Sequence, residues 1–359
     1  MALTGGLLFL ETWDHYTNSL TTASEKWTDG QNVLGFVTGE FASTNAASAP
    51  QVLSKTLTAD KETILAGGRF RHSGFIGSST TKLFNVRTSG GTEFFAVYVR
   101  HPSNELEIVT SAGTTTSNLA AGVLAADTWY TVEAAIRAVG ASSNWEVKVN
   151  QGQISDLTGT ATLTLQNGRL VALGALTQAS TLDVDWFWIK GGTALWASSD
   201  FIGNARKGVS KPNAADGTYG AVNWTHGGSG AGSLYTSLDE AAFNSDTDFL
   251  KDSTDAGGAP GTNDRVGWGY EDAPSAATSI LAVQRTIGVK QSVGSGGTLK
   301  PFLTNLASAN PPAFYGTSLT GLSPNWVFRT QAYDAAPDGT AWTVAKFNAL
   351  LGGVECNDL

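Results

Sequence analysis

The sequence predicts an all-β protein built from two β-sandwich domains in tandem. Short runs rich in Val, Ile, Phe, Tyr and Trp alternate with clusters of Gly, Asn, Ser and Thr, which is the pattern of antiparallel strands joined by turns. The length of 359 residues exceeds one ordinary β-sandwich and suits two. We expect a first domain over residues 1–195 and a smaller second β-sandwich over residues 196–359 that ends in a short α-helix.

The strands of the first domain are expected from residue 93 onward. They are the runs "EFFAVYVR", "NELEIVT", "TWYTVEAAIR", "NWEVKVNQGQ", "GRLVALGAL" and "LDVDWFWIK". In the fourth run Trp145, Val147 and Val149 alternate with Glu146 and Lys148. Successive side chains of a strand point to opposite faces, so the first three should face the core and the other two should face away from it. Two stacked sheets follow from this pattern.

The strongest strands of the second domain are "SILAVQRTIGVKQS" and "NWVFRTQAYD", which we expect in its core. Near the end, Val344, Phe347 and Leu351 recur at helical spacing after Thr343, a residue suited to cap a helix. The pair Gly352-Gly353 predicts a left-handed stop. Such a short helix is unstable alone, so it should cover one open end of the second sandwich.

The charge distribution argues against nucleic acid or an anionic membrane as the main partner. The net charge is −9, with 16 acidic against 12 basic residues before position 196 and 15 against 10 after it. Phosphate binding requires clustered Lys and Arg, which neither half provides. The single cysteine, Cys356, can form no internal disulfide. The start "MALTGGLLFLETWDHY" has no basic region or long apolar run, so we expect a soluble protein without an export signal.

The order "DTWYTVEAAIR", "WEVKVNQGQ", "GRLVALGA" and "STLDVDWFWIKGG" resembles the closing half of a concanavalin A-like, laminin-G-type jelly roll. The opening "LLFLETWDHYT" is similar to the first strand of such domains, which pairs with the last strand. The resemblance covers about residues 5–192. It implies a jelly-roll fold, and it implies little about function because members of this superfamily bind calcium, bind sugars, cleave glucans or only pack.

Two carboxylate pairs of the first domain are candidate site residues. Glucanases of this superfamily carry the pattern Glu-x-Asp-x-x-Glu, and Glu105 and Glu107 match it only in part; the alternative is the acidic face of an edge strand. Asp183 and Asp185, two positions apart, would share a face and could bind calcium, or they could be solvated carboxylates of an outer face.

Other combinations of residues point to no chemistry. The four histidines, His15, His72, His101 and His226, have no partner at the spacing of metal ligands or of a catalytic triad. The acidic stretch "DTDFLKDSTD" lacks the Gly and Glu of an EF-hand loop. The sequence therefore predicts no catalytic residue, no cofactor and no metal.

The second half resembles a module of tailed-bacteriophage structural proteins, in which it follows a laminin-G-like sandwich. The resemblance rests on the closing pattern "DGTAWTVAKFNALLGGVE", where seven residues fit: Trp342, Thr343, Phe347, Asn348, Ala349, Gly353 and Glu355. It implies a virion component that assembles in the host cytoplasm with other tail, neck or capsid proteins. The module has no agreed chemistry, so no functional residue can be transferred.

These observations predict a non-catalytic structural protein of the virion, such as a fibre or decoration protein, and a homo-oligomer that by analogy with spikes is a trimer. The alternatives are a glycan-degrading enzyme of the particle, or a cellular lectin or adhesin. Adhesion to cell-surface carbohydrate would use exposed aromatic rings, for which Trp27, Trp224 and Trp268 lie in turn-like surroundings. By contrast, Trp129, Trp145, Trp186 and Trp188 lie on predicted strands and are assigned to the sandwich core.

Overall fold

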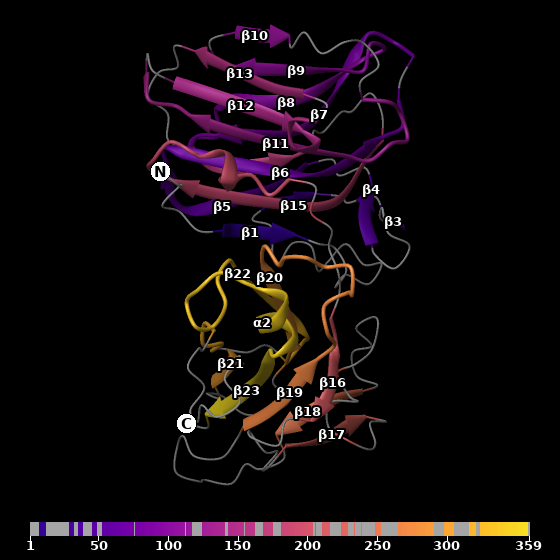
Figure 1. Ribbon diagram of the computed structural model, residues 1–359, viewed down its shortest axis with the longest axis vertical. Coiled ribbons are helices and arrows are strands. Elements are labelled where there is room, and N and C mark those ends of the chain that lie inside the picture. Colours follow the sequence, from indigo (N-terminus) through magenta and orange to yellow (C-terminus); the bar gives the residue numbers. More distant parts are fainter. Residues whose placement is uncertain are drawn as a thin grey trace. The chain divides into compact units, whose positions relative to one another are not determined.

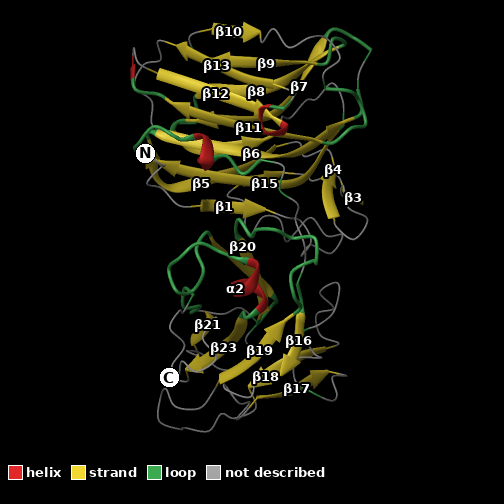
Figure 2. Cartoon of the chain, viewed as in Figure 1, coloured by secondary structure: helices red, strands yellow, loops and turns green. Residues whose placement is uncertain are grey.

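The computed structural model consists almost entirely of antiparallel strands, which confirms the all-β prediction (Figure 2). It describes residues 7–11, 29–31, 35–38, 45–48, 52–74, 76–111, 113–116, 124–140, 143–153, 155–161, 168–174, 181–203, 205, 210–215, 224–228, 233, 238, 248–252, 265–290, 298–304, 316–320 and 324–357. The chain divides into two compact units, residues 1–207 and 208–359. The expected domain boundary after residue 195 stays a prediction.

The N-terminal unit is a sandwich of an eight-stranded and a seven-stranded antiparallel sheet (Figure 1). The first has the order β13-β12-β11-β6-β15-β4-β3, with β1 paired to β15. Its strands are β1 (Leu7–Glu11), β3 (Gly35–Thr38), β4 (Asn45–Ser48), β6 (Thr63–His72), β11 (Tyr130–Arg137), β12 (Ser143–Val149), β13 (Ser155–Ala161) and β15 (Leu182–Gly192). The second has the order β10-β9-β8-β7-β14-β5-β2. Its strands are β2 (Asp29–Gln31), β5 (Val52–Lys61), β7 (Ser79–Arg87), β8 (Glu93–His101), β9 (Glu105–Thr110), β10 (Gly113–Thr116) and β14 (Gly168–Leu173).

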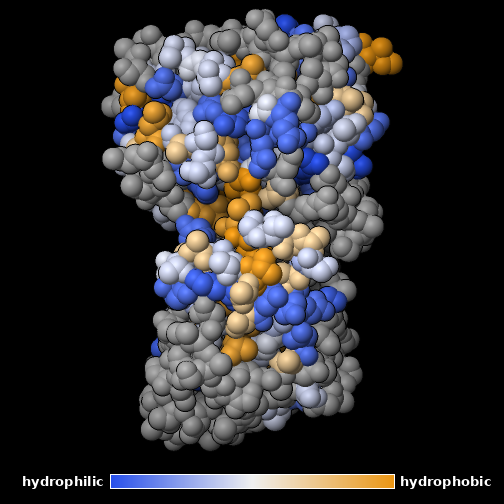
Figure 3. Space-filling model, viewed as in Figure 1, coloured by the Kyte–Doolittle hydropathy of each residue, from blue (hydrophilic) through white to orange (hydrophobic). Residues whose placement is uncertain are grey.

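Two predictions from the sequence are confirmed in this unit. The opening strand β1 pairs antiparallel with the last strand β15, as the resemblance implied. In β12, Trp145, Val147 and Val149 are buried in the core between the sheets. The core is made by inward residues of both sheets, among them Phe84, Phe95 and Phe187. The outer face visible in Figure 3 is mainly hydrophilic over this unit, with smaller hydrophobic groups between.

A β-bulge changes the parity of β15 and corrects the expectation for its tryptophans. The register with β6 shifts between Val184 and Trp186, so one extra residue, Asp185, is inserted there. As a result Phe187 faces the core between the sheets, while Trp186 and Trp188 face outward. Both tryptophans are still buried, because residues 196–203, here called the covering segment, pack over them. This segment includes the short 3₁₀ helix η3 (Ser198–Asp200); a second, η2 (Asn150–Gly152), follows β12.

The C-terminal unit contains a four-stranded sheet and two strand pairs. The sheet has the order β16-β19-β23-β21, and the pairs are β17-β18 and β20-β22. The strands are β16 (Pro212–Ala215), β17 (Trp224–Gly228), β18 (Asp248–Asp252), β19 (Arg265–Tyr270), β20 (Val283–Val289), β21 (Thr298–Thr304), β22 (Val327–Tyr333) and β23 (Leu351–Asn357). The two strands expected in the core, β20 and β22, are confirmed as strands, but they pair with each other outside the four-stranded sheet.

The predicted terminal helix is present as α2 (Val344–Asn348), and Thr343 caps it by accepting a hydrogen bond from the Lys346 backbone N–H. Two details differ from the prediction. None of the helix residues is buried; the flanking Trp342 and Leu350 anchor it instead. The chain then continues into β23, where Gly352 and Gly353 are extended residues beside aromatic rings rather than a left-handed stop.

Candidate functional site

A network of polar side chains occupies the outer face of the seven-stranded sheet. In β8, Phe95, Val97 and Val99 face the core, so Tyr98 and Arg100 face outward. Lys82 of β7 lies opposite Tyr98 in the ladder, and Glu107 of β9 lies opposite Tyr98 on its other side. Three neighbouring strands thus bring a phenol, two cations and a carboxylate to one face.

Glu93, at the start of β8, is the centre of this network. Its Oε2 atom accepts hydrogen bonds from Lys82 Nζ at 2.8 Å and from Asn85 Nδ2 at 2.5 Å. Its Oε1 atom accepts from the Tyr98 hydroxyl at 3.3 Å. Both Lys82 and Glu93 are half-buried, so their ion pair is less screened by water than a fully exposed pair.

Tyr98 lies between the two charged groups. The Lys82 ammonium is 5.0 Å from the centre of its ring. Burial raises the pKa of the Tyr98 phenol, and the neighbouring Lys82 lowers it by a smaller amount. The phenol is therefore protonated at neutral pH and is able to donate a proton. On the far side, Arg100 forms an ion pair with Glu107 at 3.4 Å between Nε and Oε2.

Asn85 lies beneath the network and has an unused acceptor. The residue is 0% exposed, and its amide nitrogen is bonded to Glu93. Its Oδ1 atom is buried and has no hydrogen-bond partner among the described residues. A buried acceptor without a donor costs about 1–3 kcal/mol, so such an atom requires an explanation. A ligand could donate a hydrogen bond to this atom only if its binding displaced the side chains that cover Asn85.

The network can perform acid–base chemistry. The Tyr98 hydroxyl is a proton donor in hydrogen-bond contact with the Glu93 carboxylate, and such a positioned pair can move a proton to and from a bound molecule. The cations Lys82 and Arg100 can stabilise negative charge that develops nearby. The site combines donors and acceptors on one half-buried surface.

The structure places the predicted Glu105 and Glu107 on this same face, on strand β9. The suggested edge-strand explanation is wrong, because β9 lies between β8 and β10. Glu105 accepts a hydrogen bond from Ser103 Oγ at 3.1 Å, and Glu107 pairs with Arg100. The sequence reading missed the other residues of the network. The outward positions of "EFFAVYVR" give a signal for Tyr98 and Arg100, but Lys82 and Asn85 are joined to them only by strand pairing.

Asp183 and Asp185 lie on either side of Val184, which faces the core. The register shift in the ladder falls at Asp185, and both carboxylates are buried, so the alternative of solvated outer-face carboxylates is wrong. Asp183 Oδ2 accepts from Arg71 Nε at 2.9 Å and Nη2 at 2.7 Å. Among the described residues, no group of three or more His, Cys, Asp or Glu side chains is placed to hold a metal ion.

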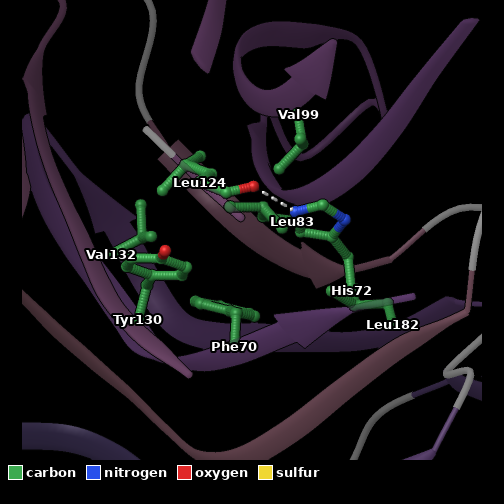
Figure 4. A pocket seen from close by; sticks show the side chains of 8 residues that line it. All are labelled: Phe70, His72, Leu83, Val99, Leu124, Tyr130, Val132 and Leu182. Atoms are coloured by element: carbon green, nitrogen blue, oxygen red, sulfur yellow. Dashed lines mark hydrogen bonds between the residues drawn. The ribbon is translucent and has the colours of Figure 1, made fainter. Parts of the chain in front are cut away.

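Two of the four histidines come together inside the N-terminal sandwich. His72 and His101 are buried, with ring centres 5.3 Å apart. His72 borders a small, mostly apolar cavity, shown in Figure 4. The cavity is lined by Phe70, His72, Leu83, Val99, Leu124, Tyr130, Val132 and Leu182. His226 lies in β17 of the other unit, and His15 lies outside the described residues.

Two of the three tryptophans proposed for sugar stacking are not available for it. Trp224 and Trp268 are buried in the core of the C-terminal unit, and Trp27 lies outside the described residues. Of the four tryptophans assigned to the sandwich core, Trp145 is there. Trp129 is half-buried beside the Arg71 guanidinium, 4.8 Å from its ring centre. None of the helices in the described part of the chain is long and apolar enough to span a membrane.

No protein-family model matches the sequence, and no curated protein matches it significantly. Several solved structures are similar. An endo-β-1,4-glucuronan lyase of the fungus Trichoderma reesei matches at 14% identity and a TM-score of 0.38, over 52% of this chain and 96% of that one. A carbohydrate esterase of the Shiga toxin-encoding bacteriophage phi24B matches at 14% and 0.38, over 53% and 100%. An alginate lyase of Pseudomonas aeruginosa matches at 11% and 0.34, over 45% and 87%.

The prediction that the chain is not an enzyme is contradicted, since the solved structures similar to it include two lyases and an esterase. The prediction rested on the incomplete carboxylate pattern around Glu105 and Glu107. That pattern belongs to a single mechanism, so its absence says nothing about acid–base chemistry by other residues. At these identities and TM-scores the matches assign neither an activity nor a substrate to this chain.

Proposed function

We propose that the N-terminal unit binds a polysaccharide on the outer face of its seven-stranded sheet and cleaves it by acid–base catalysis. The observation that carries the proposal is the contact between the Tyr98 hydroxyl and the Glu93 carboxylate, with Lys82 held against both. A half-buried proton donor next to a carboxylate and a cation requires the desolvation of several polar groups. Such clusters are typical of functional sites.

The chemistry of the face suits a carbohydrate. Sugar hydroxyls are both donors and acceptors, and the network offers ammonium and guanidinium donors together with carboxylate acceptors. A sugar hydroxyl could bond to the Asn85 Oδ1 atom only if binding displaces the side chains that cover it, because this atom is fully buried. In the proposed reaction the bond between a sugar carbon and the bridging oxygen breaks, and Tyr98 gives its proton to the departing oxygen. Glu93 accepts a proton either from an attacking water or from the sugar carbon next to the broken bond.

The test is turnover on a panel of neutral and uronate polysaccharides, followed by new reducing ends and by unsaturated products. Tyr98→Phe and Glu93→Gln should each lower kcat by about 100-fold or more, since removing a general acid or base has an effect of this size. The KM of both variants should change only a few-fold. The control is Arg169→Gln, which removes a surface ion pair with Asp60 outside the network.

The outcome of this experiment is decisive either way. The products distinguish hydrolysis from elimination, because only elimination leaves a double bond in the sugar. If no polysaccharide of the panel is bound or cleaved, or if both variants keep wild-type kcat, the proposal is wrong.

The setting predicted from the sequence remains part of the proposal: a component of a phage particle, assembled in the host cytoplasm with other virion proteins as a homo-oligomer. Its support is the closing sequence pattern, in which Trp342 is buried, Thr343 caps α2 and Asn348 Oδ1 accepts from the Ala273 backbone N–H. The mass of the chain in solution and its position in purified particles test this part. A monomer that is missing from particles would exclude it.

A further inference from the structure

His72 and His101 join the two sheets at one end of the N-terminal sandwich. His72 is the last residue of β6 in the eight-stranded sheet, and His101 is the last residue of β8 in the seven-stranded sheet. They are 4% and 1% exposed, and their ring planes are inclined at 59°. The next residues of both strands leave the sandwich as end segments, so each ring is placed where a strand ends and a turn begins.

The hydrogen bonds of His72 require the neutral ring. Its Nδ1 atom accepts from the Gly74 backbone N–H at 3.1 Å, so Nδ1 carries no proton. Its Nε2 atom therefore carries the proton and donates it to the Leu124 carbonyl at 2.8 Å, the bond drawn in Figure 4. A second proton would have to go onto Nδ1, where it would replace the bond from Gly74.

The contacts of His101 fit the opposite neutral tautomer. Its Nδ1 atom lies 3.1 Å from the Asn104 side-chain oxygen, which only accepts, so Nδ1 is the donor. Its Nε2 atom then accepts from the Thr81 hydroxyl at 2.9 Å. The two rings thus have four oriented hydrogen bonds, and all four are formed with both rings uncharged.

These bonds are part of a closed circuit of contacts. His72 donates to the Leu124 carbonyl, and the Leu124 N–H donates to the Asn104 carbonyl at 3.3 Å. The Asn104 side chain accepts from His101, whose ring contacts His72. In addition the Asp127 N–H donates to the His72 carbonyl at 2.8 Å. The two histidines therefore hold three end segments: residues 73–74, 102–104 and 124–127.

The described surroundings of the pair are mainly apolar. The cavity beside His72 is lined mainly by aliphatic and aromatic side chains (Figure 4). Among the described residues, the titratable groups that face the pair are Asp127, whose carboxylate acts on His72 from a distance, and Tyr130, whose hydroxyl accepts from the Ala125 N–H at 3.0 Å. Two adjacent imidazolium ions would repel each other and would lose hydration in these mainly apolar surroundings.

We propose that the His72–His101 pair is an acid-sensitive latch, which keeps the three end segments closed when both rings are neutral and releases them when the rings are protonated. Burial lowers the pKa of both histidines, in agreement with closed, uncharged rings. Protonation breaks the Gly74 bond and creates two like charges 5.3 Å between ring centres. Opening relieves the lost hydrogen bond and the charge repulsion, because it brings the rings into water.

The latch also reaches the proposed glycan site. Arg100 precedes His101, and Glu105 and Glu107 follow the 102–104 turn, so this turn joins two strands of the site. Opening at acidic pH should weaken the Arg100–Glu107 pair and with it the binding of polysaccharide. This consequence rests on the proposed function, whereas the latch itself does not.

Hydrogen exchange on the full chain at pH 7.5 and pH 5.0 tests the latch. After correction for intrinsic exchange rates, peptides containing the amides of Gly74, Leu124 and Asp127 should lose protection by about 10- to 30-fold, since a histidine exposed by opening has a pKa near 6.5 and gains its proton over this range. Peptides from the central strands β11 and β12 serve as the internal control and should keep their protection. Unchanged protection of the three amides would overturn the inference.

A second arm uses His72→Gln/His101→Gln, in which neither position can take a proton. Protection of the same peptides should then be independent of pH. The same pH-dependent loss in this variant would overturn the inference. If the variant does not fold, the titration of the ring protons of His72 and His101 in the wild-type chain decides. Both rings must stay neutral below pH 6.5, and their protonation must follow the same pH dependence as the loss of amide protection. Ordinary independent titration of the two rings would contradict the latch. None of these readouts requires polysaccharide, so failure of the proposed function leaves them intact.

Discussion

Asn85 lowers the stability of the free protein, because its buried Oδ1 atom has no hydrogen-bond donor in the part of the chain that the structure describes. We predict that Asn85→Ala changes the free energy of unfolding by less than about 1 kcal/mol, since the lost bond to Glu93 is offset by removal of the buried, unpaired Oδ1. The same variant should weaken polysaccharide binding at least tenfold. Urea unfolding and calorimetric titration measure the two quantities.

Ser143 provides the matched control for this prediction. It is equally buried, but its hydroxyl donates to the Gly140 carbonyl at 2.7 Å and accepts from the Val139 N–H at 3.0 Å. Ser143→Ala should therefore cost about 1–3 kcal/mol and leave binding unchanged. A large stability loss in Asn85→Ala, equal to that of Ser143→Ala, would show that Asn85 is simply a structural residue.

Gly353 is required by close packing and not by its backbone angles. A Cβ atom there would come closer than 3.0 Å to both the Phe302 ring and the Val266 carbonyl oxygen. The carbonyl belongs to the neighbouring strand β19 and cannot move away alone. We predict that Gly353→Ala destabilises the C-terminal unit by about 1–3 kcal/mol, as overpacking of a core does; thermal or urea unfolding measures this.

Gly269 gives the comparison within the same sheet, because its nearest neighbours would lie at an ordinary 3.7 Å from a Cβ atom. Gly269→Ala should change stability by less than about 1 kcal/mol. Equal effects of the two alanine substitutions would contradict the packing argument.

The pair Gly352-Gly353 also shows what the sequence alone does not predict. Glycine after a helix suggests a left-handed stop. At position 353 glycine is needed instead because the Phe302 ring lies against the backbone, and this contact follows only from the pairing of the strands.

At the scale of the element, the covering segment depends on one buried carboxylate. Glu133 of β11 is 0% exposed, and its oxygens accept from the Ile202 N–H at 2.7 Å and from the Gly203 N–H at 2.9 and 3.0 Å. Burial raises the pKa of Glu133, and the two amide hydrogen bonds and the nearby Lys190 and Lys148 oppose this effect.

The raised pKa predicts how stability depends on pH. The unfolded chain releases this proton near the ordinary value of 4.5, whereas the folded chain keeps it to higher pH. The contribution of Glu133 to the free energy of unfolding is therefore complete below pH 4.5, and it is lost as the pH rises through the pKa of the folded state. Relative to Glu133→Gln, which does not titrate, the free energy of unfolding of the wild-type protein should fall by up to about 1.4 kcal/mol per pH unit in this window. Urea unfolding of both proteins from pH 4 to 7 measures it, and parallel curves would refute the prediction.

The elements themselves were largely predictable, because alternation survives in most strands. In β12 the inward side of Trp145, Val147 and Val149 follows directly from the sequence. In β15 the same reasoning fails at Asp185, since a bulge adds one residue and reverses the faces that follow. The polar network was not predictable either. Lys82, Glu93 and Tyr98 meet because β7 and β8 pair in one particular register, and register depends on the whole sheet.

At the scale of the whole molecule, the chain forms two compact units, and the first extends to residue 207. The sequence placed the boundary after residue 195, where the last predicted strand ends. The structure indicates why the following residues matter to the first unit. Trp196, Phe201 and Ile202 pack on Trp186 and Trp188 of the outer face, and the Trp196 ring nitrogen donates to Glu146.

We predict that the fragment 1–207 folds alone, while the fragment 1–195 is less stable by about 3–6 kcal/mol, the value expected for uncovering two large aromatic side chains. The shorter fragment would also leave Glu133 buried without the amide donors of Ile202 and Gly203. A fragment 1–203 keeps the covering segment and is the matched control; its urea midpoint should equal that of 1–207. Because Trp186 and Trp188 become exposed only in 1–195, their fluorescence should shift to longer wavelength in that fragment alone. Equal midpoints for 1–195 and 1–207 would mean that the covering segment is a passive linker and that the boundary predicted from the sequence is the physical one.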